Sequence, residues 1–391
     1  MSLFHGNRSL IEQARSLYVL IRRQEGITRQ MLSEQLDMPA TSLNRALDRQ
    51  LQLGLIEEYG FADSTGGRRP GLYRIVSQAY YLFGLDLSGA AGHLALQVVE
   101  QIDLPGIDLL LEEGLGDVIC RSCRVILDRQ GISADKLLGL GVGWSAPVVH
   151  AAEASGADVD VPGLKDGIPD HESRPGEHTA LSPVFADISA ALGIPVFSLR
   201  GADAALYAGL WQQNSLADGT FLYLSAGRSI RYAMAVRGQL HVTGLTTDSI
   251  GDLVVPWSMH PEGQRLDQVA TIPAMVRRFR KSKNDKTLDW SDFCLAAAAG
   301  KKKAGSIVTE AAQCMALSIQ NMTILTGGRY LLLGGQALFD LPAYESAIRH
   351  ELASLAKSGA RIPLLMDLAY GNCILAVGAS AYVLEMSLGQ A

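Results

Sequence analysis

The sequence predicts an α/β protein that begins with a separate, mainly helical domain carrying a β-hairpin. Up to Leu53, apolar residues recur at three- and four-residue spacing, which is typical of amphipathic helices. Two short strand-like runs then flank a stretch rich in Gly and Arg at 64–70. Past Gln78, β-type runs alternate with helical segments, the pattern of layered α/β domains. We therefore expect two domains, at residues 1–77 and 78–391.

Length, composition and charge agree with this division. A chain of 391 residues exceeds the usual size of one domain, and 48% apolar with 19% charged residues indicates a folded globular protein. No apolar run reaches the roughly 18 residues of a membrane span, and the start lacks the layout of a secretion signal. We therefore expect a cytoplasmic protein without a membrane partner.

The net charge of −6 conceals an asymmetry between the two domains. Residues 1–77 hold ten Arg, no Lys and eight acidic residues, a formal charge of +2, and the remainder of the chain carries −8. A basic first domain on an acidic body suits a protein that places one small domain on the phosphates of a nucleic acid.

The first domain is predicted to hold three helices. Apolar residues mark the first helix from Ser9 to Arg23, and Gly26 ends it. Thr28 is suited to cap a second helix that runs through Leu36, because its hydroxyl can accept a backbone hydrogen bond. After a short turn at Pro39, a third helix is expected from Ala40 to Leu53. Two helices joined by a tight turn form a candidate helix-turn-helix.

The third helix has two distinct sides. At 100° per residue, the leucines at positions 43, 47 and 51 share one side, and polar residues with two arginines cluster roughly opposite. Exposed arginines and small polar groups on a helix in the major groove contact guanine edges and phosphates. The alternative is a solvated helix face without a ligand.

A β-hairpin follows this helix and favours the DNA-binding interpretation. Strands are expected at Leu55 to Tyr59 and at Gly71 to Val76, with Ser64 to Pro70 as a flexible, basic tip between them. Such a hairpin is typical of the wing of a winged helix-turn-helix, whose partner is a double-stranded DNA operator. The residues expected to contact DNA are Thr41, Ser42, Asn44, Arg45, Arg49, Gly67, Arg68 and Arg69.

The larger domain is marked by strand runs separated by helical segments, which predicts α/β layers. The runs are Tyr81 to Leu87, Leu138 to Val142, Pro195 to Leu199, Thr220 to Leu224 and Tyr330 to Leu333.

Several motifs in the same order resemble those of the ROK family (repressors, open reading frames and sugar kinases), best its repressor branch. The matching segments are Gly66-Gly67-Arg68-Arg69-Pro70 with Leu72-Tyr73-Arg74-Ile75, Phe83-Gly84-Leu85-Asp86-Leu87-Ser88-Gly89, Leu140-Gly141-Val142-Gly143 through Pro147-Val148, Gly193-Ile194-Pro195-Val196, and Leu333-Gly334-Gly335. The resemblance implies a winged helix-turn-helix followed by a two-lobed fold of the actin-like, ribonuclease-H-like ATPase type. Lobe one is expected at about 78–190 plus 371–391, with a closing helix near Gly371 to Met386, and lobe two at about 191–370.

The catalytic motif of the family's kinases is altered in this chain. A kinase of this type needs a carboxylate to take the proton from the sugar hydroxyl, and the family places it in a Glu-Asn-Asp-Ala motif. The aligned stretch here is Leu199-Arg200-Gly201-Ala202-Asp203-Ala204-Ala205, with Gly201 at the position of the base. Asp203 is two residues further on and is not expected to replace it.

The phosphate, sugar and zinc motifs are altered as well. The family's Gly-Thr-Gly-Ile-Gly corresponds to Gly227-Arg228-Ser229-Ile230-Arg231, so backbone approach to a phosphate is lost. Its Gly-Glu-x-Gly-His corresponds to Asp248-Ser249-Ile250-Gly251-Asp252, which removes the sugar-binding Glu and a zinc-ligating His. Residues 255–269 hold no cysteine. We therefore expect no enzymatic activity, no cofactor and no metal.

The altered site can still receive an effector, and the residues expected to do so are Arg200, Asp203, Ser249 and Asp252. Arg200 prompts the hypothesis of an anionic ligand, a sugar acid or sugar phosphate held by the guanidinium. The alternative is that Arg200 pairs with a neighbouring carboxylate.

The five cysteines are too few and too scattered for a disulfide scaffold, which fits a reducing compartment. Cys120 and Cys123 form the one close pair, within a predicted helix at Asp117 to Arg129. Ordinary helix packing is the favoured interpretation, and metal or redox chemistry is the alternative.

The sequence thus predicts a transcriptional regulator of carbohydrate-related genes, with repression favoured over activation. A homodimer or homotetramer would bind a two-fold operator, and a sugar or sugar-derived effector would act on the non-catalytic domain. Two alternatives stay open: an ATP-dependent sugar kinase with a DNA-binding domain, and a regulator controlled by a protein partner.

Overall fold

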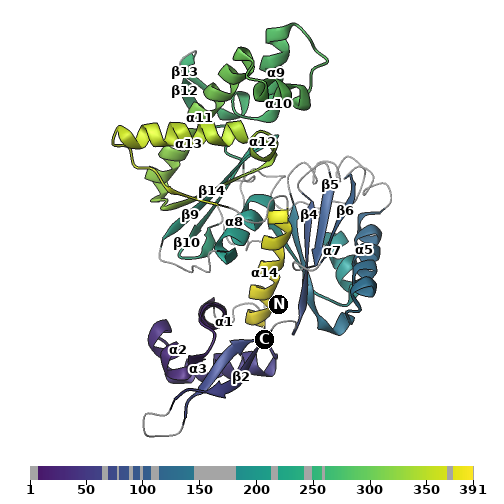
Figure 1. Ribbon diagram of the computed structural model, residues 1–391. Helices are drawn as coiled ribbons and strands as arrows, with labels where there is room; N and C mark the ends of the chain where they lie inside the picture. Colours follow the sequence, from purple (N-terminus) through teal and green to yellow (C-terminus); the bar gives the residue numbers. More distant parts are fainter. Residues whose placement is uncertain are drawn as a thin grey trace, which may run out of the picture.

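The structure is a computed structural model that describes residues 8–63, 69–76, 79–87, 91–96, 100–106, 114–144, 182–212, 219–241, 249–257, 260–367 and 373–390. Its elements form a small amino-terminal domain and two larger α/β lobes, with helix α14 between them (Figure 1).

The amino-terminal domain contains three helices and a three-stranded antiparallel sheet. Its sheet order is β1-β3-β2, and β3 pairs with both neighbours. The Thr28 hydroxyl accepts a hydrogen bond from the Met31 amide at 3.3 Å, so the predicted cap of the second helix is confirmed. The elements are α1 (Arg8–Arg23), β1 (Ile27–Thr28), α2 (Arg29–Leu36), α3 (Ala40–Gln52), β2 (Ile56–Phe61) and β3 (Gly71–Ile75).

The first lobe is built on a five-stranded sheet of order β6-β5-β4-β7-β8. Strands β4, β7 and β8 are parallel, whereas β5 and β6 are antiparallel to their neighbours. Alternate residues of β4 face opposite sides, so Phe83 and Leu85 pack in the core under α5 and α7, and Gly84 faces α14. The elements are β4 (Tyr81–Leu87), β5 (Ala91–Leu96), β6 (Glu100–Gly106), α5 (Leu115–Gln130), β7 (Leu137–Trp144), α7 (Ser182–Leu192) and β8 (Val196–Arg200), with a short 3-10 turn at Ala134–Lys136.

The second lobe repeats this topology in a sheet of order β11-β10-β9-β14-β15. Strands β9, β14 and β15 are parallel, and β10 and β11 are antiparallel to their neighbours. Helices and a two-stranded ribbon surround the sheet and share one large core. The elements are β9 (Thr220–Ala226), β10 (Ile230–Val236), β11 (Gln239–His241), β12 (Val254–Trp257), β13 (His260–Arg265), α9 (Ile272–Lys283), α10 (Trp290–Ala298), α11 (Lys302–Thr326), β14 (Tyr330–Gly334), α12 (Gln336–Asp340), α13 (Pro342–Lys357) and β15 (Leu364–Met366), with a 3-10 turn at Leu266–Gln268.

Strand β8 belongs to the first lobe. It pairs in parallel with β7, from Leu140 opposite Val196 to Trp144 opposite Arg200, and so completes the first sheet. The boundary expected near residue 190 therefore lies too early in the chain. Helix α8 (Gly201–Gln212) begins directly after this strand and leads toward the second lobe.

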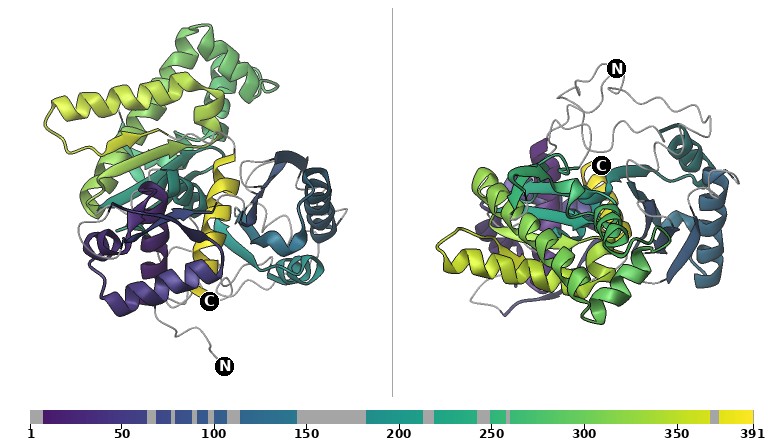
Figure 2. Two further views of the ribbon diagram at one scale, coloured as in Figure 1. Left: turned by 60° about the horizontal axis from the view of Figure 1, so that its bottom comes forward. Right: turned by 90° about the horizontal axis from the view of Figure 1, so that it is seen from above.

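Helix α14 (Ile374–Gln390) is the predicted closing helix, and it packs closely on the first lobe and on α8. A Cβ added to Gly141 would lie 2.0 Å from the Ala379 carbonyl oxygen, and one added to Gly378 would lie 1.7 Å from that of Ala204. Backbones approach this closely only where glycine stands. Figure 2 shows α14, in yellow, running between the two lobes.

Candidate nucleic-acid interface and effector site

The turn between α2 and α3 is fixed by local contacts. Asp37 adopts the left-handed conformation at φ 48°, and the buried Met38 follows it. The Ser33 hydroxyl donates to the Met38 carbonyl at 3.1 Å, which ties the end of α2 to the start of α3. The two helices therefore meet in one defined arrangement.

Helix α3 presents one apolar and one polar side, as its sequence predicts. Leu43 and Leu47 are fully buried, and the Gln50 amide donates to the Ala14 carbonyl at 2.7 Å, which anchors α3 to α1. On the opposite side, Thr41 and Arg45 are exposed. This side of α3 is accessible to a ligand.

The other three predicted contact residues of α3 are only half exposed. Ser42, Asn44 and Arg49 are partly buried. The Arg49 Nε and the Asn44 Oδ1 are shielded from solvent, and neither has a hydrogen-bond partner within the described ranges. Arg45 is therefore the more accessible of the two predicted arginines.

The hairpin β2–β3 stands beside these helices. Arg69 is exposed at the end of the described part of the hairpin, and the predicted contact residues Gly67 and Arg68 lie outside the described residues. Arg74 is held by the hairpin itself, because its Nε is 2.7 Å from Glu57 and its guanidinium lies 4.6 Å from the centre of the Tyr59 ring. Arg69 thus adds an exposed charge, whereas Arg74 is structural.

A second group of candidate residues lies where the lobes meet, between β8 of the first sheet and β10 of the second. The Nε of Arg200, the last residue of β8, donates at 2.7 Å to the carboxylate of Asp203 in the first turn of α8. This ion pair is what the alternative interpretation of Arg200 expected. Asp203 is nearly inaccessible, and a charge buried to this degree requires such a partner.

Arg231 of β10 approaches Gly201 across this junction. Its Nη1 lies 3.6 Å from the point where a Cβ on Gly201 would stand, and its Nε donates to the Ser229 hydroxyl at 3.1 Å. Ser249 forms an antiparallel bridge with Arg231. We call Arg200, Gly201, Asp203, Arg231 and Ser249 the junction cluster.

Two neighbouring groups complete the electrostatics of the junction cluster. Burial, and to a lesser extent the Asp203 carboxylate, raises the pKa of Tyr232 to about 12, so this phenol stays protonated at neutral pH. The exposed Asp252 pairs with Arg265 instead. Of the four predicted effector residues, the structure thus brings Arg200, Asp203 and Ser249 together around Arg231, and the side chain of Asp252 is engaged elsewhere.

Two glycines of the segments that resemble ROK motifs, Gly84 and Gly335, have packing roles in this chain. A Cβ on Gly84 would lie 1.9 Å from the Ala376 carbonyl oxygen. Gly335 has φ 99°, and its Cβ would lie 2.5 Å from the Ala226 carbonyl oxygen. These glycines are therefore required by the backbone, whether or not a nucleotide binds.

Helix α5 contains both cysteines of the Cys-x-x-Cys pair. Cys120 and Cys123 are buried in the core of the first lobe, and burial raises the pKa of both thiols.

Within the described ranges, no three His, Cys, Asp or Glu side chains are grouped to hold a metal ion. No helix in the described part of the chain is both long and apolar enough to span a membrane.

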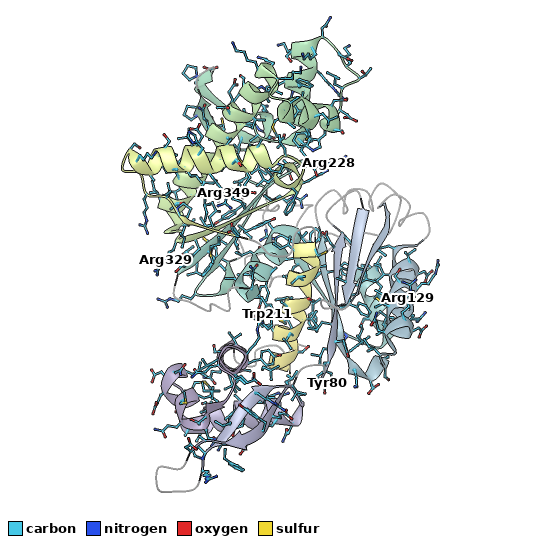
Figure 3. The ribbon with its side chains drawn as sticks, in the orientation of Figure 1. Tyr80, Arg129, Trp211, Arg228, Arg329 and Arg349 are labelled. Atoms are coloured by element: carbon cyan, nitrogen blue, oxygen red, sulfur yellow. The ribbon has the colours of Figure 1, made fainter. Side chains whose placement is uncertain are left out.

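A contact between the amino-terminal domain and α8 was not foreseen from the sequence. Trp211, which is labelled in Figure 3, lies near the end of α8. Its ring stacks on Tyr18 of α1 and lies under the guanidinium of Arg22. No local pattern predicts this pairing, because Arg22 and Trp211 are 189 residues apart in the sequence.

Known proteins with similar sequences include xylose repressors. No protein-family model matches the chain. It is 21% identical over 364 residues to a xylose repressor of Caldicellulosiruptor bescii, which covers 85% of this chain and 86% of that protein. A putative xylose repressor of Caldicellulosiruptor sp. strain Rt8B.4 is 31% identical over 93 residues, and the match spans 23% of either chain.

Solved structures with similar folds include both regulators and kinases. A ROK family transcriptional regulator, described as a homologue of the Escherichia coli Mlc protein, covers 98% of this chain and 100% of its own at 16% identity, with a TM-score of 0.66. A ROK hexokinase from Thermus thermophilus covers 77% of this chain and 97% of its own at 18% identity, with a TM-score of 0.56. The resemblance to the ROK family that the motifs predict is thereby confirmed: this chain has the fold of ROK proteins and resembles a xylose repressor along most of its length.

Proposed function

We propose that this protein is a sequence-specific DNA-binding transcriptional regulator of carbohydrate-related genes, acting as a repressor from the cytoplasm. In this proposal α2 and α3 form the helix-turn-helix, and the hairpin β2–β3 is the wing. The observation that carries it is the two-sided α3, with Leu43 and Leu47 buried and Thr41 and Arg45 exposed, in a chain similar to a xylose repressor.

The charges of the domain support a nucleic-acid partner. Arg45 on α3 and Arg69 on the hairpin are both exposed, and the domain is basic on an otherwise acidic chain. An operator of double-stranded DNA would take α3 in its major groove and the wing, with Gly67 and Arg68, along the backbone or minor groove. A homodimer or homotetramer would present two such domains to two half-sites.

The larger domain acts in this proposal without catalysis. A proton-accepting carboxylate is needed beside a sugar hydroxyl, but Gly201 has no side chain, and the nearby guanidinium of Arg231 cannot accept a proton. The neighbouring carboxylate, Asp203, is buried and paired with Arg200. These contacts disfavour phosphoryl transfer and support a sensing role.

The junction cluster is the proposed effector site, because it lies between two lobes whose relative position a ligand can change. A sugar or sugar-derived effector would meet Ser249 and the guanidinium groups of Arg231 and Arg200. By favouring one arrangement of the lobes, it would favour one spacing of the DNA-binding domains. Asp252, which is paired with Arg265, would contribute only after that pair opens.

Selection of genomic fragments by the purified full-length protein, followed by footprinting, tests the proposal. The expected result is a small set of two-fold sites next to carbohydrate genes. The matched control is Arg121→Glu, which places the same charge change on an exposed position of α5, far from α3 in the sequence. If selection yields no preferred sequence, or if Arg45→Glu selects the same sites as strongly as Arg121→Glu does, the proposal fails.

A sugar kinase with a DNA-binding domain is the second candidate, because ROK kinases share the fold of the two lobes. A coupled ATPase assay across a panel of hexoses separates the two, since the proposed regulator gives no sugar-dependent turnover.

Control by a protein partner is the third candidate. Capture with the full-length protein, with and without operator DNA, tests it, because such a partner would remove the protein from DNA in the absence of any sugar.

A further inference from the structure

The amino-terminal domain contacts the larger domain through one partly buried tryptophan, Trp211. The ring of Trp211 stacks on that of Tyr18, with centroids 6.3 Å apart and planes inclined by 19°. The guanidinium carbon of Arg22 lies 4.2 Å from the centre of the Trp211 ring, and Arg22 Nη2 donates to the Trp211 carbonyl at 3.0 Å. Helix α1 therefore holds both the ring and the backbone of Trp211.

This contact belongs to a continuous apolar interface. Leu17 and Ile21 of α1 share a core with Leu82 of β4 and with Val383 and Leu384 of α14, all of them buried. Because Gln50 ties α3 to α1 at Ala14, a displacement of α1 also moves α3. The position of α3, the helix proposed to contact DNA bases, is thus set by the residues that α1 packs against.

Helix α8 links Trp211 to the junction cluster. Its first turn contains Gly201 and Asp203, and Trp211 is its next-to-last residue. Ten residues, from Gly201 to Leu210, are buried one after another, so the helix is enclosed by packing on all sides. At 1.5 Å per residue, the ten-residue step from Gly201 to Trp211 spans about 15 Å.

The beginning of α8 lies next to a residue of the second lobe. Asp203 is paired with Arg200, and Gly201 faces Arg231, which is carried by β10 of the other sheet. Along its length α8 is in backbone contact with α14, where Gly378 meets the Ala204 carbonyl. A packed helix with such contacts moves as a unit, because side chains at interior density leave no room for local yielding.

We propose that α8 is the coupling element of this protein, which transmits a change at the junction cluster to the DNA-binding domain through the contact of Trp211 with Tyr18 and Arg22. This inference rests on the proposed function and adds its mechanical route. A ligand or a movement of Arg231 displaces the first turn of α8, and the displacement reaches α1 at the other end. The energetic consequence is a coupling between two sites on opposite ends of one helix.

A double-mutant cycle with Asp203→Asn and Trp211→Ala tests this route in the full-length protein. Asp203→Asn removes the charge of the Arg200 pair without changing side-chain volume, and Trp211→Ala removes the contact with α1. Two quantities are read: the hydrogen-exchange rates of the α1 amides, and the affinity for DNA selected by the wild-type protein. Thermal unfolding of each variant checks that it is folded.

Asp203→Asn is expected to change the exchange rates of the α1 amides and the DNA affinity at least five-fold in the wild-type background. In the Trp211→Ala background, the same substitution is expected to change each of them less than two-fold. The control is Trp290→Ala on α10, an aromatic of similar exposure that stacks on Phe293 and donates to Asp340 in the second lobe. In that background the full effect of Asp203→Asn is expected to persist.

Additive effects in the cycle, within two-fold, or an Asp203→Asn variant that leaves α1 exchange unchanged, would overturn the inference. The two hypotheses fail separately. If the wild-type protein selects no DNA but the exchange cycle is non-additive, the proposed function is wrong and the coupling stands. If DNA is selected and both cycles are additive, the function stands and the coupling is wrong.

Discussion

Arginines in this chain have different roles that depend on what each side chain meets. Arg45 is exposed on α3, whereas Arg200, Arg22 and Arg74 are each held by a partner from the protein itself. A guanidinium that already donates to a carboxylate or a carbonyl has fewer donors left for a ligand. At the scale of single residues, the partner that a guanidinium already holds therefore separates structural arginines from candidate DNA contacts.

Reversing the charge of Arg45 is expected to weaken operator binding by about ten-fold or more, because one good base or phosphate contact contributes about 1–3 kcal/mol. Arg49→Glu is expected to have a smaller effect on affinity and a larger effect on stability, because Arg49 is half-buried. DNA titrations at several salt concentrations measure the affinity of the two variants. Arg45→Glu should reduce the dependence of the binding constant on salt.

The control for this series is Arg121→Glu, whose affinity and salt dependence should equal those of the wild-type protein. Equal losses in Arg45→Glu and Arg121→Glu would show that overall charge, and not the surface of α3, governs binding.

Buried thiols predict a loss of stability at alkaline pH. Burial raises the pKa of Cys314 to about 11 and raises that of Cys123 further. In the unfolded chain these thiols ionise near their ordinary value of 9.0, so rising pH ionises the unfolded state first and favours it. Their contribution to stability is complete below pH 9 and is lost as pH rises through the folded pKa.

The expected result is a free energy of unfolding that is steady from pH 7 to 8.5 and falls between pH 9 and 11, measured by urea titration. Each such group contributes a slope of at most about 1.4 kcal/mol per pH unit. Cys314→Ala should flatten the fall. An unchanged slope in this variant would show that Cys314 is not the group that titrates.

At the scale of elements, α14 depends on small residues that let backbones touch. Gly84 and Gly141 in the first sheet, and Gly378 in the helix itself, each face a carbonyl at a distance that excludes a Cβ. The sequence marks Gly84 and Gly141 only as members of segments that resemble ROK motifs, and it does not single out Gly378. The packing of α14 provides a reason for these glycines that does not involve a ligand.

Gly141→Ala is expected to lower the free energy of unfolding by about 3 kcal/mol, because its Cβ meets the Ala379 carbonyl and neither backbone can move away. Gly305→Ala is the control, since Gly305 is exposed within α11 with no atom within 4 Å of a new Cβ. It should stabilise by about 0.5–1 kcal/mol. Thermal and urea unfolding of both variants provides the comparison, and similar effects in the two would contradict the packing argument.

At the scale of the whole molecule, two lobes of the same strand order meet around α14, and the amino-terminal domain is joined to them by a shared core. Leu82, Val383 and Leu384 come from the larger domain, yet they cover Leu17 and Ile21 of α1. The amino-terminal domain is therefore an integral part of the fold, and not a freely tethered head.

An isolated segment of residues 1–79 is accordingly expected to unfold at a lower temperature than the same domain in the full chain, because the apolar side of α1 is left uncovered. Circular dichroism of the segment, and hydrogen exchange of α1 in the full protein, measure the difference. Equal protection of α1 in both forms would show that the shared core adds no stability.

The sequence by itself determined the features that depend on neighbours along the chain. The periodicity of leucines set the sides of α3, Thr28 capped α2, and strands such as Tyr81 to Leu87 were predicted from their apolar runs and found. The order of the motifs also sufficed for the family resemblance. These features are local because hydrogen bonds within a helix and alternation along a strand involve residues a few positions apart.

Only the tertiary structure decided which residues from distant parts of the chain meet. Pairing with β7 placed β8 in the first lobe, Asp203 took Arg200 as its partner, Arg231 came to face Gly201, and Trp211 met Tyr18 and Arg22. Such contacts arise from sheet register and helix packing between segments far apart in sequence, which no local pattern encodes.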